Sequence, residues 1–218
     1  MTGAPLPTKI VCVGRNYAAH ARELGNDVPR WPLLFLKPPS AVIRDGDAIR
    51  LPPDSERVEH EAEIGVVIGQ RARSVSVSEA LSCVAGFAPL NDVTARDLQR
   101  LDVQFTRSKA FDTFCPVGEA RSCADWRDLE VLARVNGAVR QHGRASDMIF
   151  GIPQLITYIT RIMTLFPGDI IATGTPEGVG PLLAGDTVEI EIPGIGAVRN
   201  PVRSPEMSAE TTNTDVPE

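Results

Sequence analysis

The sequence predicts an α+β fold that is rich in β-strands and built on a mixed, largely antiparallel sheet. Strand candidates outnumber helix candidates, and several of them are joined by short turns, which is typical of hairpins rather than of crossover connections. Asn136-Gly137 is one of the strongest hairpin signals known, and Pro193-Gly194 marks a second turn of this kind. A chain of 218 residues is long enough to bury one sizeable core. We therefore expect a single β-rich catalytic domain.

The first elements follow from short apolar runs and the breakers between them. Residues 9–13 read as a buried strand, and Asn16 is placed to cap a short helix that runs to about Leu24. Residues 33–37 form a second strand that Pro38-Pro39 ends, and residues 48–51 form a third after the turn Asp45-Gly46-Asp47.

The central segment contains the longest strand candidate, residues 58–69. A capping-box pattern from Ser76 to Glu79 predicts a helix to about Val84. A strand over residues 86–90 then ends at Asn91-Asp92, and Thr94 opens a helix to about Leu101.

The C-terminal half is predicted to contain two hairpins and the most apolar helix. The hairpins pair residues 129–135 with 138–141 and residues 187–192 with 197–202. Between them come a helix over residues 152–163 and a strand over residues 169–172. Residues 204–218 are polar, acidic and poor in large apolar side chains, so we expect a disordered tail after a catalytic domain of residues 1–203.

Composition excludes several classes of function. A formal charge of −6 without a basic stripe argues against a nucleic-acid partner. No apolar run is long enough to cross a membrane, and residues 1–9 lack a signal peptide, so a cytoplasmic location is expected. The four cysteines form no Cys-x-x-Cys pair and are expected to be reduced, apolar side chains. Lysine is scarce, with Lys9, Lys37 and Lys109 against nineteen arginines, which slightly favours a role for each as a compact charge.

Acidic residues provide the strongest indication of chemistry. In a strand, Glu59, Glu61 and Glu63 would share one face, and they lead directly into an apolar core segment. Buried carboxylates repel one another and lose hydration unless a cation neutralises them, so the pattern suggests a site for a hard metal ion. Asp92, at a strand end, is a plausible further ligand. A solvated acidic edge strand and a simple helix cap are the alternatives.

Other residues could surround such a site. Arg96 and Gln99 follow Asp92 at helical spacing and can face the same space. The segment 174–180 is glycine-rich but lacks the Gly-Lys-Ser/Thr of a nucleotide-binding loop, so it is either a plain turn or a loop whose N–H groups hold a carboxylate. His20 and Glu23 lie three residues apart on a predicted helix, an arrangement that suits a general base and its orienting acid but also an ordinary surface pair.

Taken together, these segments resemble the fumarylacetoacetate hydrolase family, and in particular its short, single-domain acylpyruvase branch. The resemblance runs in order from about residue 9 to residue 203, and it is carried by the segments 13–23 (VGRNYAAHARE), 35–38 (FLKP), 60–63 (HEAE), 91–99 (NDVTARDLQ), 109–112 (KAFD) and 173–180 (TGTPEGVG).

The resemblance implies a β-rich fold around a carboxylate-bound Mg²⁺ or Mn²⁺, usually in a homodimer. By matching position, Glu61, Glu63 and Asp92 become the metal ligands. Lys109 and Thr175 would hold the carboxylate and keto end of a small 2-keto acid, with Arg96 and Gln99 supporting metal and substrate. His20 and Glu23 would activate water, on a segment that can close as a lid.

The expected activity is hydrolysis of a C–C bond in an acylpyruvate, a fumarylpyruvate-like 2,4-diketo acid, with release of pyruvate. The same site could decarboxylate oxaloacetate or act as a keto–enol or double-bond isomerase, because each reaction develops charge on the same keto oxygen. The pair His20 and Glu23 tilts the expectation toward hydrolysis. A non-catalytic ligand-binding domain is the remaining alternative.

Overall fold

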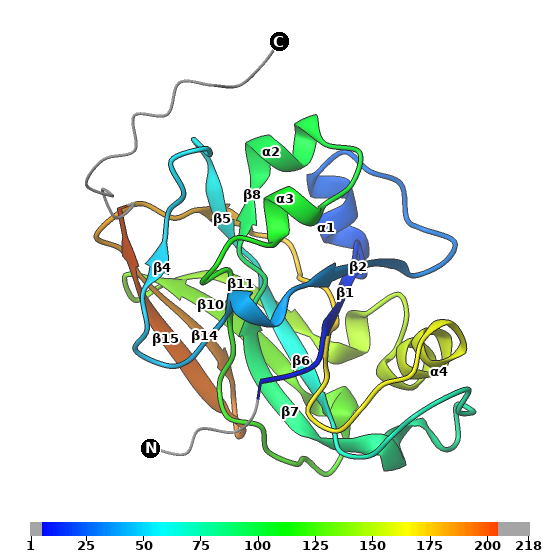
Figure 1. Ribbon diagram of the computed structural model, residues 1–218. Helices are drawn as coiled ribbons and strands as arrows, with labels where there is room; N and C mark the ends of the chain where they lie inside the picture. The colour runs from blue at the N-terminus through cyan, green and yellow to red at the C-terminus, as the bar shows by residue number, and fades with distance from the viewer. Residues whose placement is uncertain (1–5, 205–218) are drawn as a thin grey trace.

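The computed structural model describes residues 6–204, and its strands form two five-stranded sheets with two smaller ones beside them (Figure 1). The first sheet has the order β2-β1-β12-β6-β7, with bounds Leu33–Lys37, Ile10–Gly14, Ile170–Ala172, Ala62–Ile68 and Val84–Asn91. The second has the order β11-β10-β14-β15-β4, with bounds Ala138–Arg144, Glu130–Val135, Thr187–Ile192, Gly196–Arg203 and Ile49–Arg50. A three-stranded sheet joins β13 (Gly180–Pro181), β5 (Val58–His60) and β8 (Thr94–Ala95), and a pair joins β3 (Val42–Ile43) to β9 (Cys115–Pro116).

Most strand pairs are antiparallel, while β1 with β12, β15 with β4 and β3 with β9 are parallel. The helices are short: α1 (Ala18–Glu23), α2 (Arg96–Leu101), α3 (Thr106–Lys109) and α4 (Ile152–Ile162), with 3-10 turns at Pro39–Ala41, Ala80–Cys83, Trp126–Asp128 and Ala145–Asp147. The predicted β-rich α+β class is confirmed. In Figure 1, α1, α2 and α3 lie together at the top of the molecule, and α4 lies apart from them.

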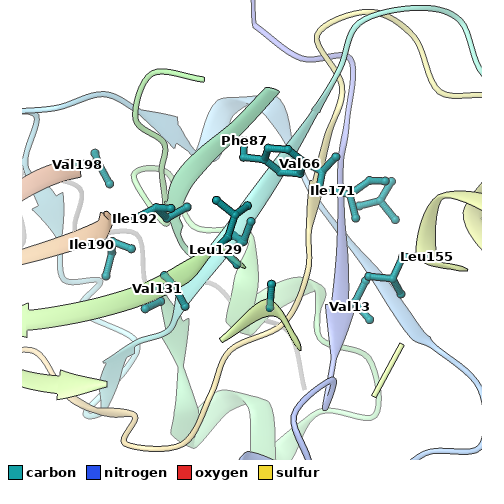
Figure 2. Packing of buried hydrophobic residues seen from close by; sticks show 14 of the residues in the cluster. Val13, Val66, Phe87, Leu129, Val131, Leu155, Ile171, Ile190, Ile192 and Val198 are labelled. Atoms are coloured by element: carbon teal, nitrogen blue, oxygen red, sulfur yellow. The ribbon is translucent and has the colours of Figure 1, made fainter. Parts of the chain in front are cut away.

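The core lies between the two large sheets and under α4 (Figure 2). Val66 of β6 and Phe87 of β7 belong to the same buried cluster as the inward side chains of the second sheet, which include Val131, Ile190, Ile192 and Val198. The helix α4 buries Ile152, Leu155, Ile156 and Ile159 in the same cluster. Each fully buried aliphatic side chain contributes roughly 1.5–3 kcal/mol relative to exposure. This packing fixes β6 and β7, the strands from which the acidic residues extend.

The hairpin around Asn136-Gly137 forms as predicted, because its turn chemistry is local. Asn136 and Gly137 both have positive φ, 51° and 81°, the pair of left-handed residues that a tight two-residue turn requires. The hairpin of β14 and β15 is also confirmed, with pairing from Thr187↔Pro201 to Ile192↔Gly196.

The predicted continuous strand over residues 58–69 is wrong. The chain breaks at Glu61 into β5, which pairs with β8 and β13, and β6, which pairs with β7 and β12. One segment therefore supplies strands to two sheets, and the break places Glu61 at their junction.

The predicted helix over residues 76–84 is also wrong, although its cap forms. The Ser76 N–H and hydroxyl both donate to Glu79 Oε2, at 3.1 and 2.6 Å. Only the 3-10 turn Ala80–Cys83 follows, because Val84 is already paired with Ile68 in the sheet. Too few residues remain for an α-helix to develop.

Asn16 does not cap α1, which begins after Tyr17. Its side chain is fully buried and instead joins two distant segments, with Nδ2 donating to Thr173 O at 2.7 Å and Phe150 N donating to Oδ1 at 2.8 Å. The helix predicted to open at Thr94 starts late, at Arg96, because Thr94 and Ala95 pair with β5.

Two expectations from composition can be compared with the described residues. Within residues 6–204, no helix is long and apolar enough to cross a membrane. All four cysteines are free thiols, and Cys12, Cys83 and Cys115 are buried. The predicted acidic tail lies, from Pro205 onward, outside the described residues.

Candidate metal centre and active site

Glu61, Glu63 and Asp92 meet at the end of the β6–β7 pair. Ala62 of β6 pairs with Asn91 of β7, and the Asp92 N–H donates to Glu61 O at 2.9 Å. This register places the acid that follows β7 beside the two glutamates. One carboxylate oxygen from each residue lies within 4.8 Å of the others, and all three residues are at most 5% exposed.

Three buried cations surround two of these carboxylates. Lys109 Nζ bridges Glu61 Oε2 and Asp92 Oδ2, at 2.8 and 2.6 Å. Lys37 donates to the other oxygen of Asp92 and, at 2.9 Å, to Val93 O. Arg96 binds the other oxygen of Glu61. Both oxygens of Glu61 and of Asp92 are therefore held in place.

Arg96 also links Glu61 to its neighbours. Its Nε donates to Glu59 Oε2 at 2.7 Å, and its Nη1 donates to Gln99 Oε1 at 2.5 Å. Glu59 therefore shares a cation with Glu61, as the alternating acids in the sequence suggested, but it is not in the group of three carboxylates.

The pKa values of Glu61 and Glu63 are shifted in opposite directions. Burial alone would raise the pKa of Glu61, but the charges of Lys109 and Arg96 outweigh burial and hold this pKa well below its usual range. Burial raises the pKa of Glu63 well above its usual range, and the nearby charges of Asp92 and Glu61 raise it further. Its Oε2 accepts the Gly174 N–H at 2.8 Å, and no cation among residues 6–204 forms an ion pair with it.

The donor set fits a hard divalent cation. Three carboxylates converge, all ligands are oxygen atoms, and the electrostatic conflict at Glu63 would be relieved by added positive charge. Lys109 keeps its proton, since the charges of Asp92 and Glu61 outweigh burial and raise its pKa above the ordinary value.

All the site residues predicted from the sequence line one cavity of about 350 Å³. The three acids share it with the remaining predicted residues, which are His20, Glu23, Arg96, Gln99, Lys109 and Thr175. These residues come from α1, α2, α3, β6 and three loops. Figure 1 shows the three helices side by side.

His20 and Glu23 form the expected pair. His20 is 4% exposed, and its Nδ1 lies 3.1 Å from Glu23 Oε2. The other oxygen of Glu23 accepts the Gly178 N–H at 2.9 Å, so the glycine-rich loop holds the acid that orients the imidazole. His20 Nε2 is then the ring nitrogen left for a ligand.

Thr175 is held by Gln141, a residue that sequence reasoning missed. The Gln141 amide is oriented by backbone, because Oε1 accepts the Ala62 N–H at 2.9 Å and Nε2 donates to Pro176 O at 2.8 Å. Nε2 also donates to Thr175 Oγ1, and the Thr175 hydroxyl donates its proton to Ala62 O. Thr175 thus presents a lone pair to the cavity and must turn its proton away from Ala62 to bind a carboxylate.

Sequence reasoning gave Lys37 no specific role. The scarcity of lysine and the segment 35–38 (FLKP) both drew attention to this residue, but its partner Asp92 lies 55 residues away in the sequence. Gln141 has a weaker signal still, because it is a single inward polar residue on the mostly exposed strand β11.

The sequence of this chain is similar to a known protein family and to several known proteins. Residues 9–203 match the fumarylacetoacetate (FAA) hydrolase C-terminal family. A protein of Methanocaldococcus jannaschii is 50% identical over 201 residues, covering 92% of this chain and 85% of its own length. The mitochondrial oxaloacetate tautomerase FAHD1 of Arabidopsis thaliana is 47% identical over 199 residues, covering 88% of this chain and 89% of its own length.

Among solved structures, 5-carboxymethyl-2-hydroxymuconate delta-isomerase from Mycobacterium smegmatis superposes with a TM-score of 0.85 at 46% identity, covering 91% of this chain and 80% of that one. The family match spans the whole of the fold described above, from β1 to β15. The chain belongs to the fumarylacetoacetate hydrolase family.

Proposed function

We propose that the protein is a divalent-metal-dependent keto–enol isomerase of a small 2-keto dicarboxylic acid such as oxaloacetate. The observation that carries this proposal is the composition of the cavity that the predicted site residues line. It combines a cation-binding group of three carboxylates and a protonated lysine with a histidine oriented by a carboxylate. Mg²⁺ or Mn²⁺ is the expected ion, since every ligand is a carboxylate oxygen.

The relatives support isomerisation over the acylpyruvate hydrolysis that the sequence favoured. The Arabidopsis relative is named a tautomerase of oxaloacetate, and the Mycobacterium smegmatis structure is named a delta-isomerase. Both names describe reactions that move a proton next to a carbonyl without breaking a C–C bond.

The residues of this chain suit such a proton transfer. His20, held by Glu23 through Nδ1, takes the proton from C3 of the keto form at Nε2, and the C3–H electron pair becomes the C2–C3 double bond. The C2 oxygen receives the displaced electron pair and then a proton from water, and His20 releases the proton that it took from C3 to water. Lys109, which remains charged, stabilises the negative oxygen from within the buried site. A bound divalent cation supplies further positive charge at this end of the cavity.

Hydrolysis of an acylpyruvate is the second candidate, because the pair His20 and Glu23 would equally activate a water molecule. Decarboxylation of oxaloacetate needs the same charge stabilisation but no base. The predicted cytoplasmic location stays a prediction, since the Arabidopsis relative is named as mitochondrial.

The three reactions can be separated in one set of measurements. Oxaloacetate in D₂O with Mg²⁺ is followed by NMR for deuterium at C3, by ultraviolet absorbance for the enol, and by a coupled assay for pyruvate. An acylpyruvate is tested in parallel. We expect C3 exchange and enol equilibration to be much faster than pyruvate release from either compound, and to stop in excess chelator. Pyruvate release as fast as C3 exchange would reject the isomerase proposal.

Two substitutions test whether His20 is the general base. His20→Ala should slow enol equilibration by ~10²–10⁴-fold, the usual range for loss of a general base. His142→Ala is the matched control, because His142 is half exposed, pairs with Glu130 on the second sheet and does not line the cavity. Unchanged Mg²⁺ binding must accompany the loss in His20→Ala. An equal effect of both substitutions would reject the assignment.

A further inference from the structure

A second cavity, of about 570 Å³, shares no lining residue with the catalytic one. Its walls come from the turn between β10 and β11, from β11 itself and from the segment 178–186. The most buried residue of its lining is His60 of β5, which is 1% exposed. The reaction proposed above gives His60 no role, so this cavity is a separate feature of the fold.

The hydrogen bonds of His60 leave one ring nitrogen free. Gln141 Oε1 accepts the Ala62 N–H at 2.9 Å and lies 2.8 Å from His60 Nδ1, so Nδ1 carries the proton. Burial lowers the pKa of His60, which keeps the ring neutral. Nε2 therefore has a bare lone pair, and no group within residues 6–204 donates to it. Such a buried acceptor is costly unless water or a ligand supplies a hydrogen bond.

Gly180 keeps this nitrogen accessible. It pairs with His60 across β13 and β5, and a Cβ on it would lie 3.5 Å from His60 Nε2, an ordinary van der Waals distance. Apart from its chain neighbours, no other atom lies within 4 Å of that position, and Gly180 does not have a left-handed φ. An alanine would therefore fit the backbone but would cover Nε2. The glycine leaves a space in which a donor can reach the imidazole.

The same cavity has an unpaired positive charge. Both oxygens of Asp186 are occupied, since they accept hydrogen bonds from Asn136 Nδ2 and from the Leu183 N–H, each at 2.8 Å. The guanidinium of Arg140 forms no hydrogen bond or ion pair within the described part of the chain. Strand β11 bulges at Arg140, which has no pairing partner in β10. Beside burial, the charge of Arg140 lowers the pKa of His60, so the two groups lie near each other.

We propose that this cavity binds a small anion that carries a hydroxyl group. The anionic oxygens bind Arg140, because a planar guanidinium holds a carboxylate or a phosphate through two parallel hydrogen bonds. The hydroxyl donates to His60 Nε2, which lacks a donor in the protein. Val139 and Leu183, which are 55% and 65% exposed, offer apolar contact to the carbon chain between the two groups. Carboxylated and phosphorylated small polyols share this chemistry.

Four three-carbon probes separate the parts of this recognition. Glycerate and glycerol 3-phosphate have both hydroxyl and anionic groups, glycerol lacks the anion, and propionate lacks the hydroxyl. Each is titrated by calorimetry into the Mg²⁺-loaded full chain in saturating oxalate, which chelates hard cations and so occupies the catalytic cavity. We expect at least one hydroxylated anion to bind about 10–100-fold more tightly than glycerol and propionate, the usual worth of a charged hydrogen bond. The tighter of the two shows whether the site prefers carboxylate or phosphate.

Two substitutions remove the two contacts separately. Gly180→Ala should weaken binding of the hydroxylated anion by at least about tenfold, because its methyl group takes the place of the hydroxyl beside Nε2. Arg140→Gln should weaken it by a similar factor through loss of the charge. Arg144→Gln is the matched control and should have no effect, since Arg144 is exposed on the same strand, pairs with Glu130 and does not line the cavity.

NMR of the histidine rings locates the ligand independently of the variants. The chain has three histidines, so long-range ¹H–¹⁵N spectra can resolve each ring nitrogen. A hydroxyl that donates to His60 Nε2 should shift that nitrogen upfield, while the resonances of His142 stay unchanged. Four results would overturn the proposal: no probe binds, all four bind alike, Arg144→Gln weakens binding as much as Arg140→Gln, or binding leaves His60 Nε2 unshifted. None of these results bears on the proposed isomerase, whose residues line the other cavity.

Discussion

Glu63 is a site residue whose charged form its surroundings disfavour. It is 2% exposed, lies beside Glu61 and Asp92, and has no ion-pair partner within the described chain. Its pKa in the folded, metal-free protein is raised above the ordinary value of 4.5. Stability from a raised acid pKa is fully present below the unfolded pKa and is lost as pH rises through the folded pKa. Metal-free protein should therefore lose stability with rising pH because of Glu63.

Glu63→Gln tests this balance by keeping the acceptor for the Gly174 N–H while removing the charge. In chelator at pH 8, we expect the variant to be more stable than the parent by at least about 1 kcal/mol in urea unfolding. The difference should vanish near pH 4, where the parent carboxyl is protonated. Added Mg²⁺ should stabilise the parent much more than the variant. Parallel pH profiles for the two proteins would contradict this explanation.

The residues that could be foreseen are those whose spacing encodes their geometry. Glu61 and Glu63 alternate along the chain, and His20 and Glu23 lie one helical turn apart, so local periodicity predicts that each pair meets. Lys37 and Gln141 have partners 34 to 81 residues away in the sequence. Only the tertiary fold reveals such contacts, and for this reason sequence reasoning missed them.

At the scale of elements, local turn chemistry was a better guide than capping patterns. The hairpin at Asn136-Gly137 needs only its own two left-handed residues. The capping box at Ser76 forms, yet no helix follows, because pairing of Val84 with Ile68 takes the chain into the sheet. Asn16 has the composition of a helix cap, but buried carbonyl groups from distant loops compete for its amide. Tertiary contacts thus override local preference where the chain enters the site.

The glycine-rich loop gives a prediction at this scale, because Gly178 connects three segments. Its N–H holds Glu23 of α1, its φ is +93°, and a Cβ on it would lie 2.2 Å from Arg140 O on β11. Gly178→Ala should therefore lower the free energy of unfolding by about 3 kcal/mol or more, since clash adds to backbone strain. Gly137→Ala is the control, because it has φ +81° and open space around it. Its cost should be only about 1–2 kcal/mol.

Urea unfolding of the two variants measures the difference, and hydrogen exchange of residues 18–24 reports on α1. Six residues are too few for an independently stable helix, so α1 depends on contacts such as that between Glu23 and Gly178. Exchange there should rise in Gly178→Ala and not in Gly137→Ala. Equal destabilisation by the two substitutions would show that the close approach to Arg140 is relieved at little cost.

At the scale of the whole molecule, the match to the family and the last strand both end at Arg203. The acidic segment beyond it offers little apolar area to bury. Deletion of residues 205–218 should leave the melting temperature within about 2 °C of the parent value. Differential scanning calorimetry at equal protein concentration checks this. A large decrease would show that the segment contributes to the folded protein.

We propose, finally, that two copies of the chain associate through the outer side of β2. This strand lies at the end of the first sheet, with no strand on its free side within residues 6–204. Trp31, in the loop before the strand, is 63% exposed, and Leu36, on the strand, is 48% exposed. An edge strand with large exposed apolar side chains invites pairing unless a partner covers it. Light scattering should give twice the 23.5 kDa of one chain. Leu36→Glu should shift the protein toward the monomer, whereas Leu183→Glu, at a side chain 65% exposed in the loop after β13, should not. A monomeric parent, or dissociation by both substitutions alike, would reject β2 as the interface.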